Sequence, residues 1–119
     1  MVVRASHVLA VPDADATAQW FIDKLGFQTR WIDPGCWHAV TLGACTIHFG
    51  SCPDAIHPRD LGDHQYFAYL VFEDVDAYVA ECRARGLDLP DPKSQPWGMR
   101  EAPVRTPDGH RLMLGQELG

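Results

Sequence analysis

Length, composition and charge limit what this chain can be. At 119 residues, 46% of them hydrophobic, it has the size and the apolar content of one soluble domain with a buried core. Its 16 acidic and 10 basic residues leave a net charge of −6, which argues against nucleic acid as a partner, because that partner requires clustered positive charge.

Targeting and redox signals are absent from the sequence. No segment resembles a signal peptide, and no apolar run is long enough to cross a membrane. The four cysteines, Cys36, Cys45, Cys52 and Cys82, show no C-x-x-C pair and no zinc-knuckle spacing. We therefore expect a cytoplasmic protein with reduced thiols and no membrane partner.

The first predicted elements are a short strand and a helix. Residues 8–11 are apolar, and Asp13 follows as a natural N-cap whose carboxylate accepts hydrogen bonds from the first helical turn. A buried stripe at i, i+4, i+7 and i+11 is predicted for Ala14, Ala18, Phe21 and Leu25, and Gly26 ends the helix. Strands are then predicted over residues 27–32, 37–42 and 44–49, the last two as a hairpin around Gly43.

The second half of the chain repeats the first. Residues 69–86 again lead from an apolar run through Asp-x-Asp-Ala into a helix and a glycine, and Asp74 lies 61 residues after Asp13. The same shift carries the stripe onto Val75, Val79, Cys82 and Gly86. Strands are predicted over 99–105 and 111–116, while the Pro- and Asp-rich residues 88–96 remain unassigned.

The helix cap, the buried stripe and the final glycine occur together in both halves, which indicates an ancient duplication. We expect a single α+β domain over residues 1–119, built from two tandem βαβββ modules at 1–50 and 64–119, with a linker over 51–63.

These residues resemble the glyoxalase/bleomycin resistance protein/dioxygenase (vicinal-oxygen-chelate) superfamily over nearly the whole chain. The resemblance rests on Val11-Pro12-Asp13, Trp20-Phe21 and Leu25-Gly26-Phe27 in the first module and on residues 73–77 in the second. The endings Pro96–Glu101 and Pro107–Leu112 look most like the bleomycin-resistance branch. The resemblance implies a curved mixed sheet with a concave cavity, and short members of the family usually pair as homodimers.

Enzymes of this superfamily hold a divalent metal with one His, Gln or Glu from each of four strands. Strand alternation and the count back from the two caps place the matching positions at Ser6, His48, Phe67 and Met113. Only His48 is a good ligand for such a metal, so we expect no bound metal and no cofactor. A bulge in the first strand would turn His7 inward and provide a second histidine; without one, His7 faces the helix.

The residues expected to line the cavity are largely aromatic. They are Trp37, His48, Phe67, Tyr69, Trp97 and Met113. Such a lining suits a planar organic compound, and cation–π contact together with the acidic surface would favour a positively charged one. Plain core packing is the competing interpretation of aromatic residues on a sheet face.

Three functions remain open on the sequence alone. The first is a metal-independent protein that binds and sequesters a small aromatic compound, similar to bleomycin resistance proteins. The alternative is a metal-dependent glyoxalase-like lyase, isomerase or dioxygenase that uses His48. The third is an interaction module whose cavity is filled by side chains. The missing ligands favour binding over catalysis.

Overall fold

The computed structural model describes residues 1–119, which divide into two compact units, Met1–His57 and Pro58–Gly119. The division lies inside the predicted linker, and a short 3-10 helix, η1 (Pro58–Asp60), follows it directly. Neither α-helix of the chain has the length and apolar character needed to span a membrane.

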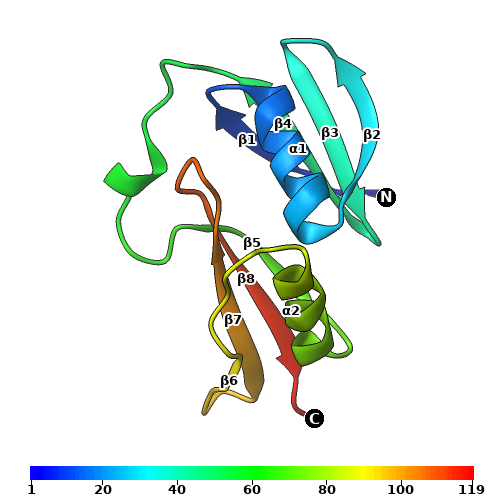
Figure 1. Cartoon of the computed structure of the whole chain (residues 1–119), viewed down its shortest axis with the longest axis vertical. Coiled ribbons are helices and arrows are strands. Elements are labelled where there is room, and N and C mark those ends of the chain that lie inside the picture. The colour runs from blue at the N-terminus through cyan, green and yellow to red at the C-terminus, as the bar shows by residue number, and fades with distance from the viewer. The chain divides into compact units, whose positions relative to one another are not determined.

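The first unit is one mixed sheet with one helix. Its elements are β1 (His7–Val11), α1 (Ala14–Leu25), β2 (Gln28–Asp33), β3 (Trp37–Leu42) and β4 (Cys45–Ser51). The strands lie in the order β1-β4-β3-β2, with β1 parallel to β4 and the other pairs antiparallel. The helix lies across one face of this sheet (Figure 1).

The second unit repeats this arrangement. Its elements are β5 (Tyr66–Val71), α2 (Val75–Ala84), β6 (Lys93–Ser94), β7 (Met99–Arg105) and β8 (Arg111–Glu117). The order β5-β8-β7-β6 has the same single parallel pair, β5 with β8 (Figure 1). The predicted α+β fold of two βαβββ modules is therefore confirmed, with a separate four-stranded sheet in each unit. The two-residue β6 lies in the segment that the sequence left unassigned.

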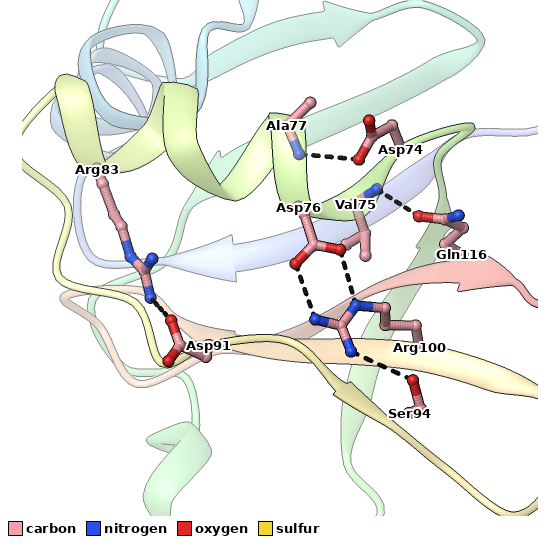
Figure 2. Close-up of polar contacts among 9 residues, drawn as sticks. All are labelled: Asp74, Val75, Asp76, Ala77, Arg83, Asp91, Ser94, Arg100 and Gln116. Atoms are coloured by element: carbon pink, nitrogen blue, oxygen red, sulfur yellow. Dashed lines mark hydrogen bonds and ion pairs between the residues drawn. The ribbon is translucent and has the colours of Figure 1, made fainter.

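Both helices begin at the predicted caps. The Asp13 carboxylate accepts hydrogen bonds from the backbone N–H groups of Asp15 and Ala16 at 3.1 and 3.2 Å. The Asp74 carboxylate accepts one from the N–H of Ala77 at 3.0 Å (Figure 2). These bonds satisfy donors that have no partner inside the helix.

A second contact of this kind also repeats between the units. The N–H of Ala14, first in α1, donates to the hydroxyl of Ser51 at 2.9 Å, and the N–H of Val75, first in α2, donates to the side-chain oxygen of Gln116 at 2.9 Å (Figure 2). Ser51 and Gln116 each follow a glycine in the strand that pairs with the first strand of their unit. The duplication therefore extends to the contacts that join helix and sheet.

The predicted stripe of α1 is buried at every position, and its Phe21 ring packs against Phe27 and Phe49 with centroids 5.3 and 4.9 Å apart. In α2 the residues Val75, Val79 and Cys82 are buried as predicted. The prediction is wrong for Gly86, which is exposed beyond the helix end. Gly86 has φ of 89°, a left-handed conformation that stops a helix and that glycine adopts without strain.

Candidate functional site

Each sheet has one face under its helix and one face that its helix leaves open. In β4 the alternation puts Ile47 and Phe49, both fully buried, on the α1 side. His48 and Gly50 therefore point to the open face. Across the sheet, Trp37 pairs with Gly50, so the sequence-predicted residues Trp37 and His48 share this open face.

A row of side chains crosses the open face of the first unit at His48. Val8 of β1 and Ala39 of β3 flank His48, and Trp31 of β2 lies beyond Ala39. The Trp31 and His48 rings meet edge to face over the small alanine, with centroids 5.6 Å apart. Two rings closing over Ala39 explain why it is fully buried although it lies on the face away from the helix.

His48 carries the one buried side-chain polar atom of the chain that lacks a hydrogen-bond partner, its Nε2. A buried polar atom without a partner costs free energy that a hydrogen bond would offset. The imidazole therefore has hydrogen-bonding capacity that the chain itself leaves unused.

Trp37 and Gly50 form one wall of a cavity of about 450 Å³. The indole lies so close over Gly50 that an added Cβ would come within 2.9 Å of its ring. Val8 and Ala10 of β1 and the exposed thiols of Cys36 and Cys52 complete much of the lining. The volume is in the range of small-molecule sites.

The open face of the second unit carries Tyr69. Leu112 and Leu114 of β8 are buried, which turns Met113 and Gly115 to the other side of the sheet. Tyr69 of β5 pairs with Met113, so these two sequence-predicted residues are neighbours. The phenol ring lies over Gly115, where an added Cβ would come within 2.6 Å of its oxygen.

A carboxylate joins Tyr69 to Trp97. The Tyr69 hydroxyl donates a short hydrogen bond to Oε2 of Glu101, and the indole N–H of Trp97 donates to the same oxygen at 3.2 Å. Glu101 pairs with Gly115 in the β7–β8 ladder, the same relation that Trp37 has to Gly50 in the first unit. Desolvation, followed by the bond to Glu101, raises the pKa of Tyr69 to about 12.

Phe67 departs from the regular alternation expected of its strand. The pairing of β5 with β8 shifts between Tyr66 and Ala68, which leaves Phe67 as the extra residue of a bulge. Its ring meets His110 edge to face at 6.1 Å. Tyr66, rather than Phe67, pairs with Arg111 of β8.

A buried histidine on the helix side has a structural environment. His38 is only 6% exposed, and its Nδ1 donates to Asp15 of α1 at 2.9 Å. Its Nε2 forms a hydrogen bond with the Thr29 hydroxyl at 2.9 Å. Hydrogen bonds from His38 and from the backbone N–H of Gly35 lower the pKa of Asp15, and together they fasten the first turn of α1 to the sheet.

Comparison with known proteins agrees with this architecture. Residues 4–114 match the Glyoxalase/Bleomycin resistance protein/Dioxygenase superfamily. The chain belongs to this superfamily. No curated protein sequence matches the chain, but many solved structures do.

Three superfamily structures illustrate the range of this likeness. A bleomycin resistance determinant encoded on the transposon Tn5 is 25% identical, with a TM-score of 0.80 over 98% of both chains. A glyoxalase-related enzyme from Clostridium phytofermentans is 22% identical, with a TM-score of 0.80 over 98% of this chain and 96% of that one. A bleomycin-binding protein complexed with bleomycin is 23% identical, with a TM-score of 0.79 over 98% and 99%. The fold is thus shared by binding proteins and enzymes.

The metal positions of the superfamily do not fit a metal in this chain. Ser6 precedes β1, Phe67 lies in the bulge, and the thioether of Met113 is a poor ligand for the hard and borderline divalent metals of such sites. His7 pairs with Ile47 on the helix side, and β1 has no bulge that would turn it towards His48. No three His, Cys, Asp or Glu side chains gather closely enough to hold a metal ion.

Two residues of the open faces were not predicted from the sequence. Trp31 was assigned to neither face, because the register shift between Thr29 and Trp31 that turns it towards His48 is set by pairing with β3. Glu101 was not selected because Tyr69, its partner, lies 32 residues away. A signal did exist for Glu101, since it falls in the segment after Trp97 that resembles the bleomycin-resistance branch.

Proposed function

We propose that this chain is a metal-independent protein that binds and sequesters a small aromatic compound, preferably a positively charged one. The observation that carries the proposal is the Glu101 carboxylate between Tyr69 and Trp97 on an open sheet face. Aromatic rings around a carboxylate attract a planar cation both by stacking and by charge. Trp97 is 64% exposed and Tyr69 is 44% exposed, so both are accessible to a ligand.

The first unit supports the same function with different chemistry. Trp37 offers an aromatic wall to the cavity of about 450 Å³, and His48, whose buried Nε2 has no partner, lies on the same sheet face outside the cavity lining. A mainly apolar cavity with few polar groups is typical of small-molecule sites. Sequestration requires no nucleophile and no metal, which suits a superfamily member whose metal positions hold Ser6, Phe67 and Met113.

The relatives support binding of this kind. One of the structures that shares the fold is a bleomycin-binding protein complexed with bleomycin, and another is a bleomycin resistance determinant. We extend to this chain the general property, capture of an organic compound, and use bleomycin only as a first probe. The protein would act in the cytoplasm, where its four free thiols stay reduced.

We also propose that the chain acts as a homodimer. The open face of the first unit exposes Val8 to 63% and also exposes Trp37. The open face of the second unit exposes Val71 to 56% and also exposes Tyr69. Exposed apolar side chains on the sheet face of either unit mark a surface that binds a partner or a ligand. Light scattering during size-exclusion chromatography should give twice the chain mass of 13.3 kDa, and a monomer at micromolar concentration would contradict this part of the proposal.

Tryptophan fluorescence tests the binding proposal. Bleomycin, 1-methylquinolinium and its neutral isostere 1-methylnaphthalene are titrated separately, and at least one of the two cationic probes should quench the emission saturably. Trp97→Ala should weaken this binding, and Glu101→Gln should weaken the methylquinolinium complex more than the methylnaphthalene complex, since only the charge differs. Trp20→Phe is the matched control, because Trp20 packs on Phe21 in α1. Absence of saturable quenching by every probe would overturn the proposal.

The metal-dependent alternative has one observation in its favour, the unpartnered Nε2 of His48 at a superfamily metal position. It predicts about one divalent ion per cavity after loading with Mn²⁺, Ni²⁺ or Zn²⁺ and removal of the excess. We expect elemental analysis to find no stoichiometric metal, and a His48→Ala variant to match the unsubstituted protein in this measurement.

A further inference from the structure

Two arginines lie directly opposite one another in the second unit. Arg105 of β7 pairs with Arg111 of β8, and Arg111 pairs in turn with Tyr66 of β5. Paired residues of neighbouring strands project to the same side of a sheet, so the three side chains form one row. This row is separate from Glu101, which lies four residues before Arg105 in the same strand.

Neither guanidinium is neutralised within the chain. The ion pairs Arg83–Asp91 and Arg100–Asp76, both drawn in Figure 2, involve neither Arg105 nor Arg111, and neither does the contact between His38 and Asp15. Arg111 donates a hydrogen bond to the carbonyl of Gly62 at 2.9 Å, which leaves most of its five N–H donors free. Like charges that face each other across a sheet are destabilising. An anion bound between the two arginines would remove that repulsion.

A cavity of about 260 Å³ lies at this row. Tyr66 and the two arginines line it, together with the segment Leu87–Pro90 after α2 and with Pro103 and Val104 of β7. Leucine, proline and valine walls suit an apolar body, while the guanidinium groups suit an oxyanion. The site thus combines an apolar space with concentrated positive charge in a chain whose net charge is −6.

One acidic residue also lies at the cavity. Asp88 is part of the lining, although it forms no ion pair with either arginine. Two guanidinium groups against one carboxylate leave the lining with a net positive charge, which favours an anion. The volume limits the ligand to a small molecule.

We propose that Arg105, Arg111 and Tyr66 form a binding site for the oxyanion, a carboxylate or a phosphate, of a small apolar acid. The two guanidinium groups bind the anionic oxygens, the Tyr66 hydroxyl donates a further hydrogen bond, and the apolar body lies against the Leu87–Pro90 segment. This site is chemically opposite to the Glu101 site, so the protein has one open position for a cation and one for an anion.

Benzoate tests this site, with benzamide as its neutral isostere. Amide NMR spectra of the full chain should show saturable shifts at the residues of the cavity with benzoate, and at least tenfold weaker binding of benzamide. Phenyl phosphate, which carries a different oxyanion on a similar apolar body, should also bind, and its affinity relative to benzoate tells which of the two oxyanions the site prefers. A neutral probe that binds as tightly as benzoate would overturn the assignment to an anion.

Arg105→Gln is the main variant, because Arg105 has no partner within the chain that its removal would leave unsatisfied. It should weaken benzoate binding about tenfold, the lower end of what a hydrogen bond to a charged group contributes. Arg4→Gln removes the same charge from the exposed N-terminal segment and serves as the control. Arg111→Lys keeps a donor for Gly62 and a positive charge but loses the forked geometry, so it should also weaken binding.

Thermal unfolding provides a second measurement. Without ligand, Arg105→Gln should melt no lower than the unsubstituted protein, since the variant relieves the charge repulsion. Benzoate should raise the melting temperature of the unsubstituted protein and of Arg4→Gln but not that of Arg105→Gln. If benzoate raised the melting temperature equally in all three proteins, or if sodium chloride at the same ionic strength raised it as much, the effect would be charge screening alone. Either result would overturn the proposed site. Trp97→Ala should leave benzoate binding unchanged, which separates this test from that of the proposed function.

Discussion

The contact between Tyr69 and Glu101 lets us predict how the pKa of the Tyr69 phenol changes when its surroundings are altered. The pKa of Tyr69 is raised from 10.0 to about 12, first by desolvation and then by the hydrogen bond and the negative charge of Glu101. Glu101→Gln removes the charge but leaves the ring in place, so the pKa should fall and remain above 10.0. Gly115→Ala displaces the ring itself, because the new Cβ would lie within 2.6 Å of the phenol oxygen. The pKa should then fall further, to near 10.0.

The assay is the near-ultraviolet absorbance of tyrosinate during an alkaline titration. The difference between each protein and its Tyr69→Phe counterpart isolates Tyr69 from Tyr66 and Tyr78. An unchanged Tyr69 pKa in Glu101→Gln, or a smaller fall in Gly115→Ala than in Glu101→Gln, would refute the reasoning. Gly62→Ala is the control, since an added Cβ there meets nothing within 4 Å.

The raised pKa of Tyr69 also determines whether stability rises or falls with pH in the alkaline range. Between pH 10 and about 12 the unfolded chain releases the Tyr69 proton while the folded chain keeps it. The unfolded state then binds fewer protons, so the free energy of unfolding falls as the pH rises through this window. Tyr69→Phe should flatten that fall. Because Tyr69 is 44% exposed, solvent screening keeps the effect small, and Tyr78, whose pKa burial also raises, contributes a background of the same sign.

Three further predictions concern the first unit. The lowered pKa of Asp15 gives stability that is present above its unfolded value of 3.8 and is lost as the pH falls through the folded value, so Asp15→Asn should reduce the loss of stability in acid, measured by circular dichroism. Ser51→Ala leaves the first N–H of α1 without its acceptor and should lower the free energy of urea unfolding by about 1 kcal/mol, whereas Ser51→Thr should retain most of it. Phe21→Ala empties a fully buried position and should cost about 3–5 kcal/mol in the same assay; a loss below about 1 kcal/mol would contradict the packing described.

Most of the fold was predictable because its signals are local. The carboxylates of Asp13 and Asp74 act within their own helical turns, and the predicted bounds of β3 and β7 agree with the structure. The predicted buried stripe is wrong only at Gly86. The shift of 61 residues carries Leu25, the last residue of α1, onto Gly86, but α2 ends two residues earlier, at Ala84.

The side-chain environments of the candidate site were less predictable because they depend on pairing between strands. Alternation placed Trp37 and His48 on one face, yet the bulge at Phe67 is set by β8 and leaves no mark in the local sequence. That the aromatic residues of the open faces bind a ligand remains a prediction. Arg105 and Arg111, in contrast, are the last residue of one predicted strand and the first residue of the next, so their pairing could be inferred from the sequence.

The shared glycines have an evolutionary consequence. Gly50 and Gly115 occupy matching places in the two copies of the module, yet the residue paired with the first is Trp37 and the residue paired with the second is Glu101. The backbone at both places stayed fixed while the facing side chain diverged, one copy towards an aromatic surface and the other towards an acidic one. The side chain that faces each glycine can therefore change in one copy alone, by substitutions that disturb neither strand register nor helix attachment.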